Sequence, residues 1–400
     1  MIYRKVDVMK NILKISLSVL LVFSLVFSFA SCNFFSGFDP DGSFEKPKAE
    51  IDYAKDDGRI KNVILIIGDG MGEAQLDAGE LAYSEEFAFR DELTKFYSNT
   101  NSLNTSTKEP TEVTDSAASA TALASGILTY NKLAGKTPDN EDTVTLLDIA
   151  SEAKKSTAVV TTDYLTGATP AGFTAHTLNR NLENEIIKSQ IKSGVDLLIG
   201  QYYDLYDDYE SSIKANYDYY TSYDEDKISK SEKALCLLDI EQDTENSVSL
   251  SKVTELAIDF LSKDKDGFVL VVEQAHIDKR CHNKDFEGAA EKAKSLNETV
   301  ETALQFAKCR DDTAVIVTAD HETCGLQVSA DPTLYSTKFT TDTGAEISYS
   351  FTATSHTDTL VPVYTYGFEP VPEICPTYTS GEKIKNCEIF LIVKDLILYS

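Results

Sequence analysis

Several features are missing from this 400-residue sequence, and each absence excludes a class of protein. Beyond the first 31 residues no apolar run is long enough to cross a bilayer, so the bulk of the chain is expected to be soluble. The sequence has no internal repeat and no glycine-rich P-loop, which excludes repeat folds and P-loop nucleotide hydrolases. No cysteine pair has the C-x-x-C spacing of a cysteine-based zinc site.

Basic residues are in short supply. The chain has 37 Lys and Arg against 65 Asp and Glu, and its formal net charge is -28. Such acidity argues against nucleic acid as a partner, and no nucleic-acid binding is expected, because binding to phosphate backbones needs a basic surface. An anionic substrate could be attracted only by local positive charge, which indicates bound metal ions.

The first 31 residues are predicted to be a secretory signal peptide. Four basic residues between positions 4 and 14 precede the apolar run from Ile15 to Ala30, and Cys32 follows two small residues. This pattern predicts a lipoprotein signal, with Cys32 lipidated and the protein held in the periplasm or cell envelope by a lipid anchor. A non-cleaved membrane anchor is the alternative. Residues 32–59 are polar and predict a tether, and residues 60–400 form the predicted catalytic domain.

Six cysteines remain after Cys32, an even number that permits disulfides in an exported chain. Their pairing cannot be derived from the sequence, although Cys375 and Cys387 bracket a short turn-rich stretch and are the favoured pair.

Apolar runs of strand length alternate with helical patterns along the body of the chain, which predicts an α/β fold with a largely parallel sheet and helices on both faces. The predicted strands are Asn62 to Ile67, Thr157 to Thr161, Gly267 to Val272, Thr313 to Val317 and Leu360 to Thr365. The predicted helices are Ser116 to Ser125, Thr145 to Lys154, Leu250 to Ser262 and Phe286 to Lys308. The Tyr- and Asp-rich stretch near 202–226 breaks the alternation and is expected to be a small surface insertion, by default a solvated loop.

Polar residues of the kinds that bind metal ions follow the predicted strands, at the edge where open α/β sheets bind ligands. Asp69 lies between two glycines, Ser116 begins a helix of small residues, and the other clusters are Glu273 to His282, Asp320 to Glu322 and Ser355 to Thr357. Taken alone, Gly-Asp-Gly is also an ordinary turn and Ser116 could simply cap its helix. The chain has only five histidines, and His282, His321 and His356 fall in these clusters beside Asp residues, a ligand set that suits Zn²⁺ and similar ions.

Six motifs in this order resemble the alkaline phosphatase family: VILIIGDGMG, TDSAASATALASG, ATPAGFTAHTLNR, VEQAHIDKRCH, VTADHETCG and SHTDTLVPVYTYG, which span Val63 to Gly367. The resemblance implies a three-layer α/β/α sandwich. It also implies hydrolysis of phosphate monoesters through a phosphoserine at a centre of two Zn²⁺ and one Mg²⁺.

The resemblance also assigns residues to roles. Ser116 is the expected nucleophile, Arg180 the guanidinium that holds the phosphate, and Lys279 a phosphate-site lysine. The expected metal ligands are Asp278, His282 and His356 for one zinc, Asp69, Asp320 and His321 for the second, and Asp69, Thr169 and Glu273 for the third site. No ligand role is expected for His176, and His276 is expected to be structural or to support a ligand.

One position departs from the family pattern. The family commonly has an acid or a histidine before Ala-Thr-Pro, and this chain has Gly167 there, so the third site is expected to be weaker, differently hydrated or filled by another ion. Two other functions stay open at this point: a phosphodiesterase-type hydrolase with a similar metal centre, and a non-catalytic phosphate-binding lipoprotein. The family resemblance also makes a homodimer an expectation.

Overall fold

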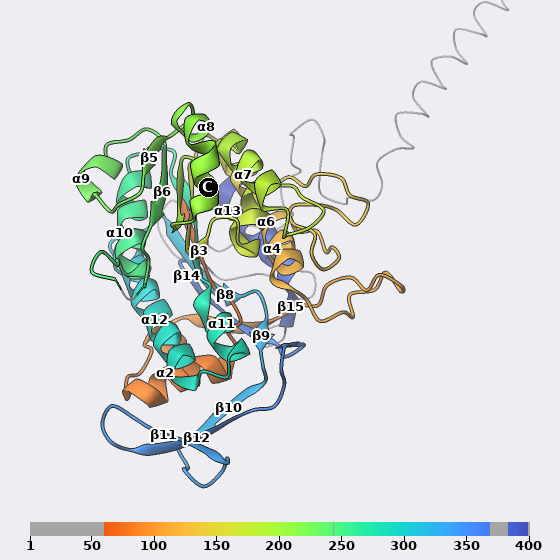
Figure 1. Ribbon diagram of the computed structural model, residues 1–400, viewed down its shortest axis with the longest axis vertical. Helices are drawn as coiled ribbons and strands as arrows, with labels where there is room; N and C mark the ends of the chain where they lie inside the picture. The colour runs from red at the N-terminus through yellow and green to blue at the C-terminus, as the bar shows by residue number, and fades with distance from the viewer. Residues whose placement is uncertain (1–59, 243, 369–382, 399–400) are drawn as a thin grey trace, which may run out of the picture. The chain divides into compact units, whose positions relative to one another are not determined.

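The computed structural model describes residues 60–242, 244–368 and 383–398, so the predicted signal peptide, tether and Cys375 lie outside the described residues. Figure 1 shows one large sheet with helices packed on both of its faces, which confirms the predicted α/β/α fold. Among the helices of the described ranges, none has the length and hydropathy needed to span a membrane.

The large sheet has ten strands, and its central part is parallel. Among the strands of the described residues in this sheet, β14 alone runs antiparallel to its two neighbours, β2 and β8. In spatial order the strands are β15 (Lys383–Lys385), β2 (Thr94–Asn99), β14 (Val361–Tyr366), β8 (Thr313–Ala319), β1 (Asn62–Gly68), β7 (Phe268–Gln274), β3 (Ser156–Tyr164), β4 (Leu197–Gln201), β6 (Ala234–Leu238) and β5 (Asp218–Tyr220).

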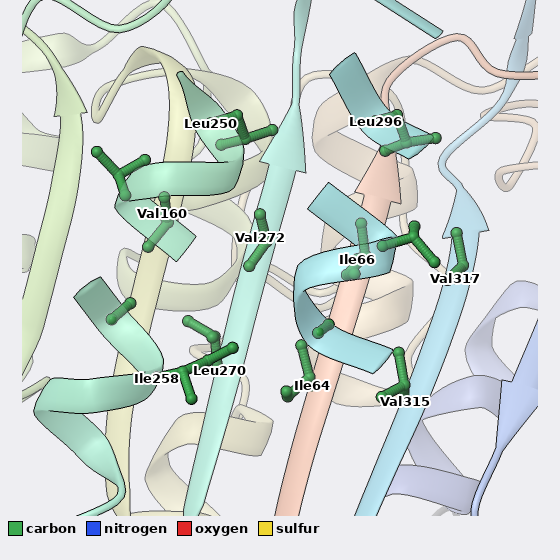
Figure 2. Packing of buried hydrophobic residues seen from close by; sticks show 14 of the residues in the cluster. Ile64, Ile66, Val160, Leu250, Ile258, Leu270, Val272, Leu296, Val315 and Val317 are labelled. Carbon is green, nitrogen blue, oxygen red and sulfur yellow. The ribbon is translucent and has the colours of Figure 1, made fainter. Parts of the chain in front are cut away.

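Alternate residues of each central strand face opposite sides of the sheet, because the side-chain period of a strand is two. In β1, Ile64 and Ile66 pack in one hydrophobic cluster, whereas Val63, Leu65 and Ile67 pack in the other. Figure 2 shows the first cluster, in which side chains of β1, β3, β7 and β8 point toward the overlying helices. A strand buried on both faces needs apolar residues at every position, which explains the uninterrupted apolar runs of the sequence.

Each cluster is completed by its own set of helices. The cluster of Ile64 includes residues of α2 (Glu73–Tyr83), α3 (Phe89–Glu92), α9 (Glu225–Ile228), α10 (Leu250–Leu261), α11 (His276–His282) and α12 (Phe286–Lys308). The cluster of Val63 includes residues of α4 (Ser116–Ser125), α5 (Leu146–Glu152), α6 (Ala168–Thr174), α7 (Glu183–Lys192), α8 (Glu210–Lys214), α13 (Asn386–Leu398) and the 3₁₀ helix η1 (Asp204–Tyr209).

Two small antiparallel sheets lie outside the large one. One contains β10 (Leu326–Ser329), β11 (Thr337–Thr340) and β12 (Glu346–Phe351), and the other pairs β9 (Glu322–Thr323) with β13 (His356–Thr357). The second sheet matters for function, because it brings the segment around His356 to the segment that follows Asp320.

The Tyr- and Asp-rich segment is more ordered than the default expectation of a solvated loop. It contains η1 and α8, and its strand β5 joins the end of the large sheet parallel to β6. Tyr206 is fully buried and its hydroxyl donates a hydrogen bond to Gln190 Oε1 at 2.7 Å. The apolar rings of tyrosines in this segment can therefore pack in the core. The sequence did not reveal this, because the tyrosines alternate with aspartates and other polar residues, a pattern typical of a solvated loop.

The five cysteines in the described part of the chain, Cys236, Cys281, Cys309, Cys324 and Cys387, all carry free thiols.

Candidate metal centre

The predicted functional residues meet at one edge of the sheet, where the parallel strands β8, β1, β7 and β3 end side by side. Asp69 follows β1, Asp320 and His321 follow β8, and Glu273 is the penultimate residue of β7. Gly70 is required between Asp69 and the neighbouring α11, because its φ is +77° and a Cβ there would lie 2.7 Å from Asp278 Cα. The Gly-Asp-Gly turn is therefore needed for close approach of two chain segments.

Ser116 is the first residue of α4 and is buried. Asp115 caps this helix, since its Oδ1 accepts a hydrogen bond from the backbone N–H of Ala118 at 3.0 Å. The helix cap is thus supplied by Asp115, which leaves the Ser116 hydroxyl free to face the site. Its Oγ lies 3.2 Å from Nε2 of His321.

A first group of metal-type ligands consists of Asp278, His282 and His356. Asp278 Oδ1 lies 3.2 Å from His282 Nε2 and 3.5 Å from His356 Nε2. His356 Nδ1 donates a hydrogen bond to the carbonyl of Thr114 at 2.8 Å, which turns its Nε2 toward Asp278. Burial would raise the pKa of Asp278, but the hydrogen bonds with His282 and His356 lower the pKa below its ordinary value.

A second group consists of Asp69, Asp278 and His321, so Asp278 belongs to both groups. His321 Nε2 lies 3.6 Å from Asp69 Oδ1 and 3.1 Å from Asp320 Oδ2. The Thr323 hydroxyl donates to Asp278 Oδ1 and therefore accepts from His321 Nδ1, at 3.2 Å. Burial lowers the pKa of His321 well below its ordinary value, so the ring is neutral and its Nε2 lone pair faces the carboxylates.

Two residues are predicted for the third site together with Asp69. Glu273 lies near the carboxyl end of β7, and Thr169 lies in the first turn of α6. Thr161 donates a short hydrogen bond to Glu273 Oε2. Burial raises the pKa of Glu273 to about 7, although the hydroxyls of Thr161 and Thr169 act in the opposite direction. Thr169 is close enough to Glu273 for this effect, yet its buried Oγ1 makes no well-aligned hydrogen bond.

The electrostatics of this edge favour bound cations. Burial raises the pKa of Asp69 well above its ordinary value and that of Asp320 to about 6, and neighbouring carboxylates add to the shift of Asp69. Three buried oxygens, Asp69 Oδ1, Asp320 Oδ2 and Thr169 Oγ1, have no hydrogen-bond partner. Buried carboxylates without partners are rare unless an ion compensates them, so this residue set fits metal ions.

The donor chemistry narrows the choice of metal. Imidazole nitrogens mixed with carboxylates suit Zn²⁺ and similar ions in the two histidine-containing groups. The predicted third set of Asp69, Thr169 and Glu273 offers oxygen atoms alone, the donor type that suits Mg²⁺. Two cations in neighbouring sites can together bind an ester and stabilise both the attacking and the leaving oxygen of a displacement reaction.

The positively charged residues predicted for the phosphate lie at this edge. Arg180 Nη1 is 3.6 Å from Asp115 Oδ2, next to the start of α4, and its side chain is one-third exposed. Lys279 Nζ is 2.6 Å from Asp163 Oδ1, so this lysine is paired with an acid that the sequence did not single out. A planar guanidinium can hold two phosphate oxygens at once.

The two remaining histidines have other surroundings. His176 Nδ1 donates to the carbonyl of Gly135 at 2.7 Å, away from the acidic cluster. Burial, together with the neighbouring positive charge of Lys279, lowers the pKa of His276 to about 4, so this ring is neutral. Sequence reasoning missed Thr323 and Thr161, whose hydroxyls orient the ligands, because a threonine at a strand end has no distinctive pattern.

Comparisons with known proteins identify the family that this chain is similar to. The family model for alkaline phosphatase matches residues 60–202 and 233–380. The chain is 33% identical over 333 residues to alkaline phosphatase 3 of Bacillus subtilis, an alignment that covers 78% of this chain and 71% of that protein. It is 29% identical over 350 residues to alkaline phosphatase of Escherichia coli, covering 69% and 73% of the two chains.

Solved structures show the same similarity. The alkaline phosphatase from the Antarctic bacterium TAB5 superposes with a TM-score of 0.72 at 31% identity, and the match covers 85% of this chain and 98% of that one. A variant of the TAB5 enzyme, with the same TM-score and identity, has Mg bound in the M3 site.

Proposed function

Because the chain belongs to the alkaline phosphatase family, and is therefore a metal-dependent phosphomonoesterase, we propose that it acts through a phosphoserine on Ser116 beside two Zn²⁺ and one Mg²⁺. The observation that carries the proposal is the position of the Ser116 hydroxyl. It lies 3.2 Å from His321 Nε2, at the N-terminus of α4, in front of buried carboxylates that lack partners. The exposed N–H groups of the first helical turn favour an anion at this point.

The metal ions would be held by three sets of residues. Asp278, His282 and His356 would bind one Zn²⁺, Asp69, Asp320 and His321 the second, and Asp69, Thr169 and Glu273 the Mg²⁺. When bound, these ions supply the positive charge that lowers the pKa of the serine hydroxyl and neutralises the ester oxygens.

The chain's own residues then account for binding and orientation. Ser116 Oγ loses its proton to solvent and attacks phosphorus, while the bond from phosphorus to the ester oxygen breaks and that oxygen takes up a proton and leaves as the alcohol. Water then attacks the phosphorus of the phosphoserine and the bond to Ser116 Oγ breaks, which releases inorganic phosphate and restores the serine hydroxyl. Arg180 holds two phosphate oxygens with its planar fork, and its contact with Asp115 fixes the guanidinium near the serine. Thr323 keeps the proton of His321 on Nδ1, so Nε2 remains available toward Ser116 and the carboxylates.

The experiment is hydrolysis of an aryl phosphate monoester by the mature protein, with and without a chelator, followed by separate addition of Zn²⁺ and Mg²⁺. Activity should disappear with chelator, return with Zn²⁺ and rise further with Mg²⁺. An aryl diester serves as the control for the phosphodiesterase alternative. Activity that is indifferent to the chelator, or faster on the diester, would refute the proposal.

The cellular setting is a second proposal, supported by the sequence alone. Export to the cell envelope and lipidation of Cys32 would place the site outside the cytoplasm, where it could act on phosphate esters that do not enter the cell. Labelling of expressing cells with a fatty-acid analogue should mark the wild-type protein but not Cys32→Ser.

Sedimentation velocity of the mature protein tests the expected homodimer.

A further inference from the structure

Position 167, where the family commonly has an acid or a histidine, lies at the N-cap of α6, just before the predicted third-site ligand Thr169. A Cβ built on Gly167 would lie 2.9 Å from the carbonyl oxygen of Tyr164 and 3.3 Å from Asp163 Oδ2. The backbone of Gly167 has a negative φ, so the conformation itself would accept a side chain. The space next to position 167 is therefore bounded by the Tyr164 carbonyl and by the carboxylate of Asp163, which is the side chain nearest to this position.

Asp163 is fixed in this place by the end of strand β3. Its backbone N–H donates to Thr161 Oγ1 at 3.0 Å, and the same Thr161 hydroxyl donates to Glu273. The pairing of β3 with β4 shifts register between Val160 and Tyr164, and such a break in the ladder changes the direction in which side chains point. Thr161 and Asp163 both lie within this shifted segment.

The other carboxylate oxygen of Asp163 is held by an ion pair across to α11. Its Oδ1 lies 2.6 Å from Lys279 Nζ, with side-chain exposures of 21% and 47%. Such a half-exposed pair adds little to stability, so its importance is expected in the site and not in folding. Both carboxylate oxygens of Asp163 are thus placed, one by Lys279 and the other against position 167.

We propose that Asp163 is a positioning residue of the third cation site, and that its carboxylate takes the place of the side chain missing at Gly167. This inference rests on the proposed function. Asp163 would not itself bind the cation directly; it would supply negative charge and hydrogen-bond acceptors for the water shell of Mg²⁺ beside Glu273 and Thr169. Residues that support metal ligands in this way typically change metal affinity about 10- to 100-fold when they are replaced.

The proposal predicts that a carboxylate at position 167 and one at position 163 exclude each other. With Asp163 in place, Gly167→Asp would put two carboxylates in contact and crowd the Tyr164 carbonyl, so it should not tighten Mg²⁺ binding. With Asp163 replaced by alanine, the same substitution fills the space that the smaller side chain leaves. The Tyr164 carbonyl crowds position 167 in both backgrounds, so only the contact between the two carboxylates differs between them. Gly167→Asp should therefore tighten Mg²⁺ binding when residue 163 is alanine and should not do so when Asp163 is present.

The experiment measures Mg²⁺ binding by titration calorimetry on the full mature protein loaded with Zn²⁺ and freed of Mg²⁺. Asp163→Asn keeps the shape and removes the charge, and it should weaken Mg²⁺ binding about tenfold or more. The double variant Asp163→Ala with Gly167→Asp should bind Mg²⁺ more tightly than Asp163→Ala alone. Glu346→Gln, which breaks a half-exposed ion pair with Lys338 on a separate sheet, is the matched control and should leave Mg²⁺ binding unchanged.

The outcomes separate this inference from the proposed function. If the wild-type protein hydrolyses the aryl phosphate but Asp163→Asn binds Mg²⁺ within twofold of wild type, the inference is wrong and the function stands. If Gly167→Asp tightens Mg²⁺ binding while Asp163 is present, the inference is also wrong. A Zn²⁺-loaded wild-type protein that neither hydrolyses the ester nor binds Mg²⁺ overturns both.

Discussion

Replacing Lys292 by methionine would break a buried ion pair that supports the end of β7. Lys292, on α12, has a side chain only 5% exposed, and its Nζ lies 3.0 Å from Glu241 Oε2. Glu241 also accepts hydrogen bonds from the Ser295 hydroxyl and from Gln274 Nε2, the latter at 3.0 Å. Burial would raise the pKa of Glu241, but Lys292 and these hydrogen bonds lower it, so the carboxylate is charged.

The loss should be large because Glu241 would remain as a buried charge without its partner. Removing one member of a buried ion pair typically costs about 3–5 kcal/mol of unfolding free energy. Unfolding entropy is about 2.1 cal/mol/K per residue, so a folded body of roughly 320 residues loses ~0.7 kcal/mol of stability per degree near Tm. Lys292→Met should therefore lower Tm by about 4–7 °C.

Differential scanning calorimetry of the metal-loaded protein measures this change. Lys338→Met is the matched control, because Lys338 and Glu346 form a pair with side chains 51% and 54% exposed, and it should lower Tm by no more than about 1.5 °C. Adding Glu241→Gln to Lys292→Met should recover part of the loss, since the amide keeps the hydrogen-bonding shape without the charge. A Tm for Lys292→Met equal to that of Lys338→Met would refute the reasoning.

Four further results are expected. Ser116→Ala should abolish the phosphate adduct seen by intact-protein mass spectrometry and reduce turnover by at least about a thousandfold, while Zn²⁺ content stays normal; full turnover would exclude the nucleophile role. Gly172→Val should lower Tm and kcat/KM together, because a Cβ there would lie 2.7 Å from Ala120 Cβ on α4 and would displace the helix that carries Ser116; an unchanged Tm would contradict this packing argument. In chelated protein, burial raises the pKa of Glu273 to about 7 from an ordinary value of 4.5. Between these two pH values the folded state therefore binds more protons than the unfolded state. The thermal stability of the chelated protein should thus fall as pH rises through that window. Metal ions need the ionised carboxylates, so the Tm difference between loaded and chelated protein should widen with pH, and a constant difference would count against the metal centre.

Helices and strands whose apolar or small residues repeat at a regular spacing were predictable from the sequence. The helices Ser116–Ser125 and Phe286–Lys308 have the predicted bounds, because small or amphipathic residues repeat at helical spacing between clear ends. The buried strand β1 is one residue longer than predicted. The segment rich in Tyr and Asp was not predictable in the same way, since the burial of Tyr206 depends on Gln190, which comes from a different helix.

The candidate site likewise has a part that the sequence predicted and a part that only the structure showed. The sequence supplied Asp69, Ser116, Glu273 and Asp320 as polar residues at strand ends or a helix start, and parallel strands bring such ends to one edge. It could not show that Asp278 lies in both ligand groups, or that His356 reaches them through the pairing of β13 with β9. Those facts depend on distances between segments far apart in the chain.

The sequence by itself determined the fold class, the family and the kind of chemistry, because hydrophobic period and short motifs are local properties of the chain. Only the tertiary structure decided which side chain lies beside Gly167. A motif comparison records an absent acid there, whereas the register shift near the end of β3 and the ion pair with Lys279 place the carboxylate of Asp163 against that position. Two residues four apart in sequence can serve one position in space when the backbone between them bends, and sequence alignment has no means of showing such a bend.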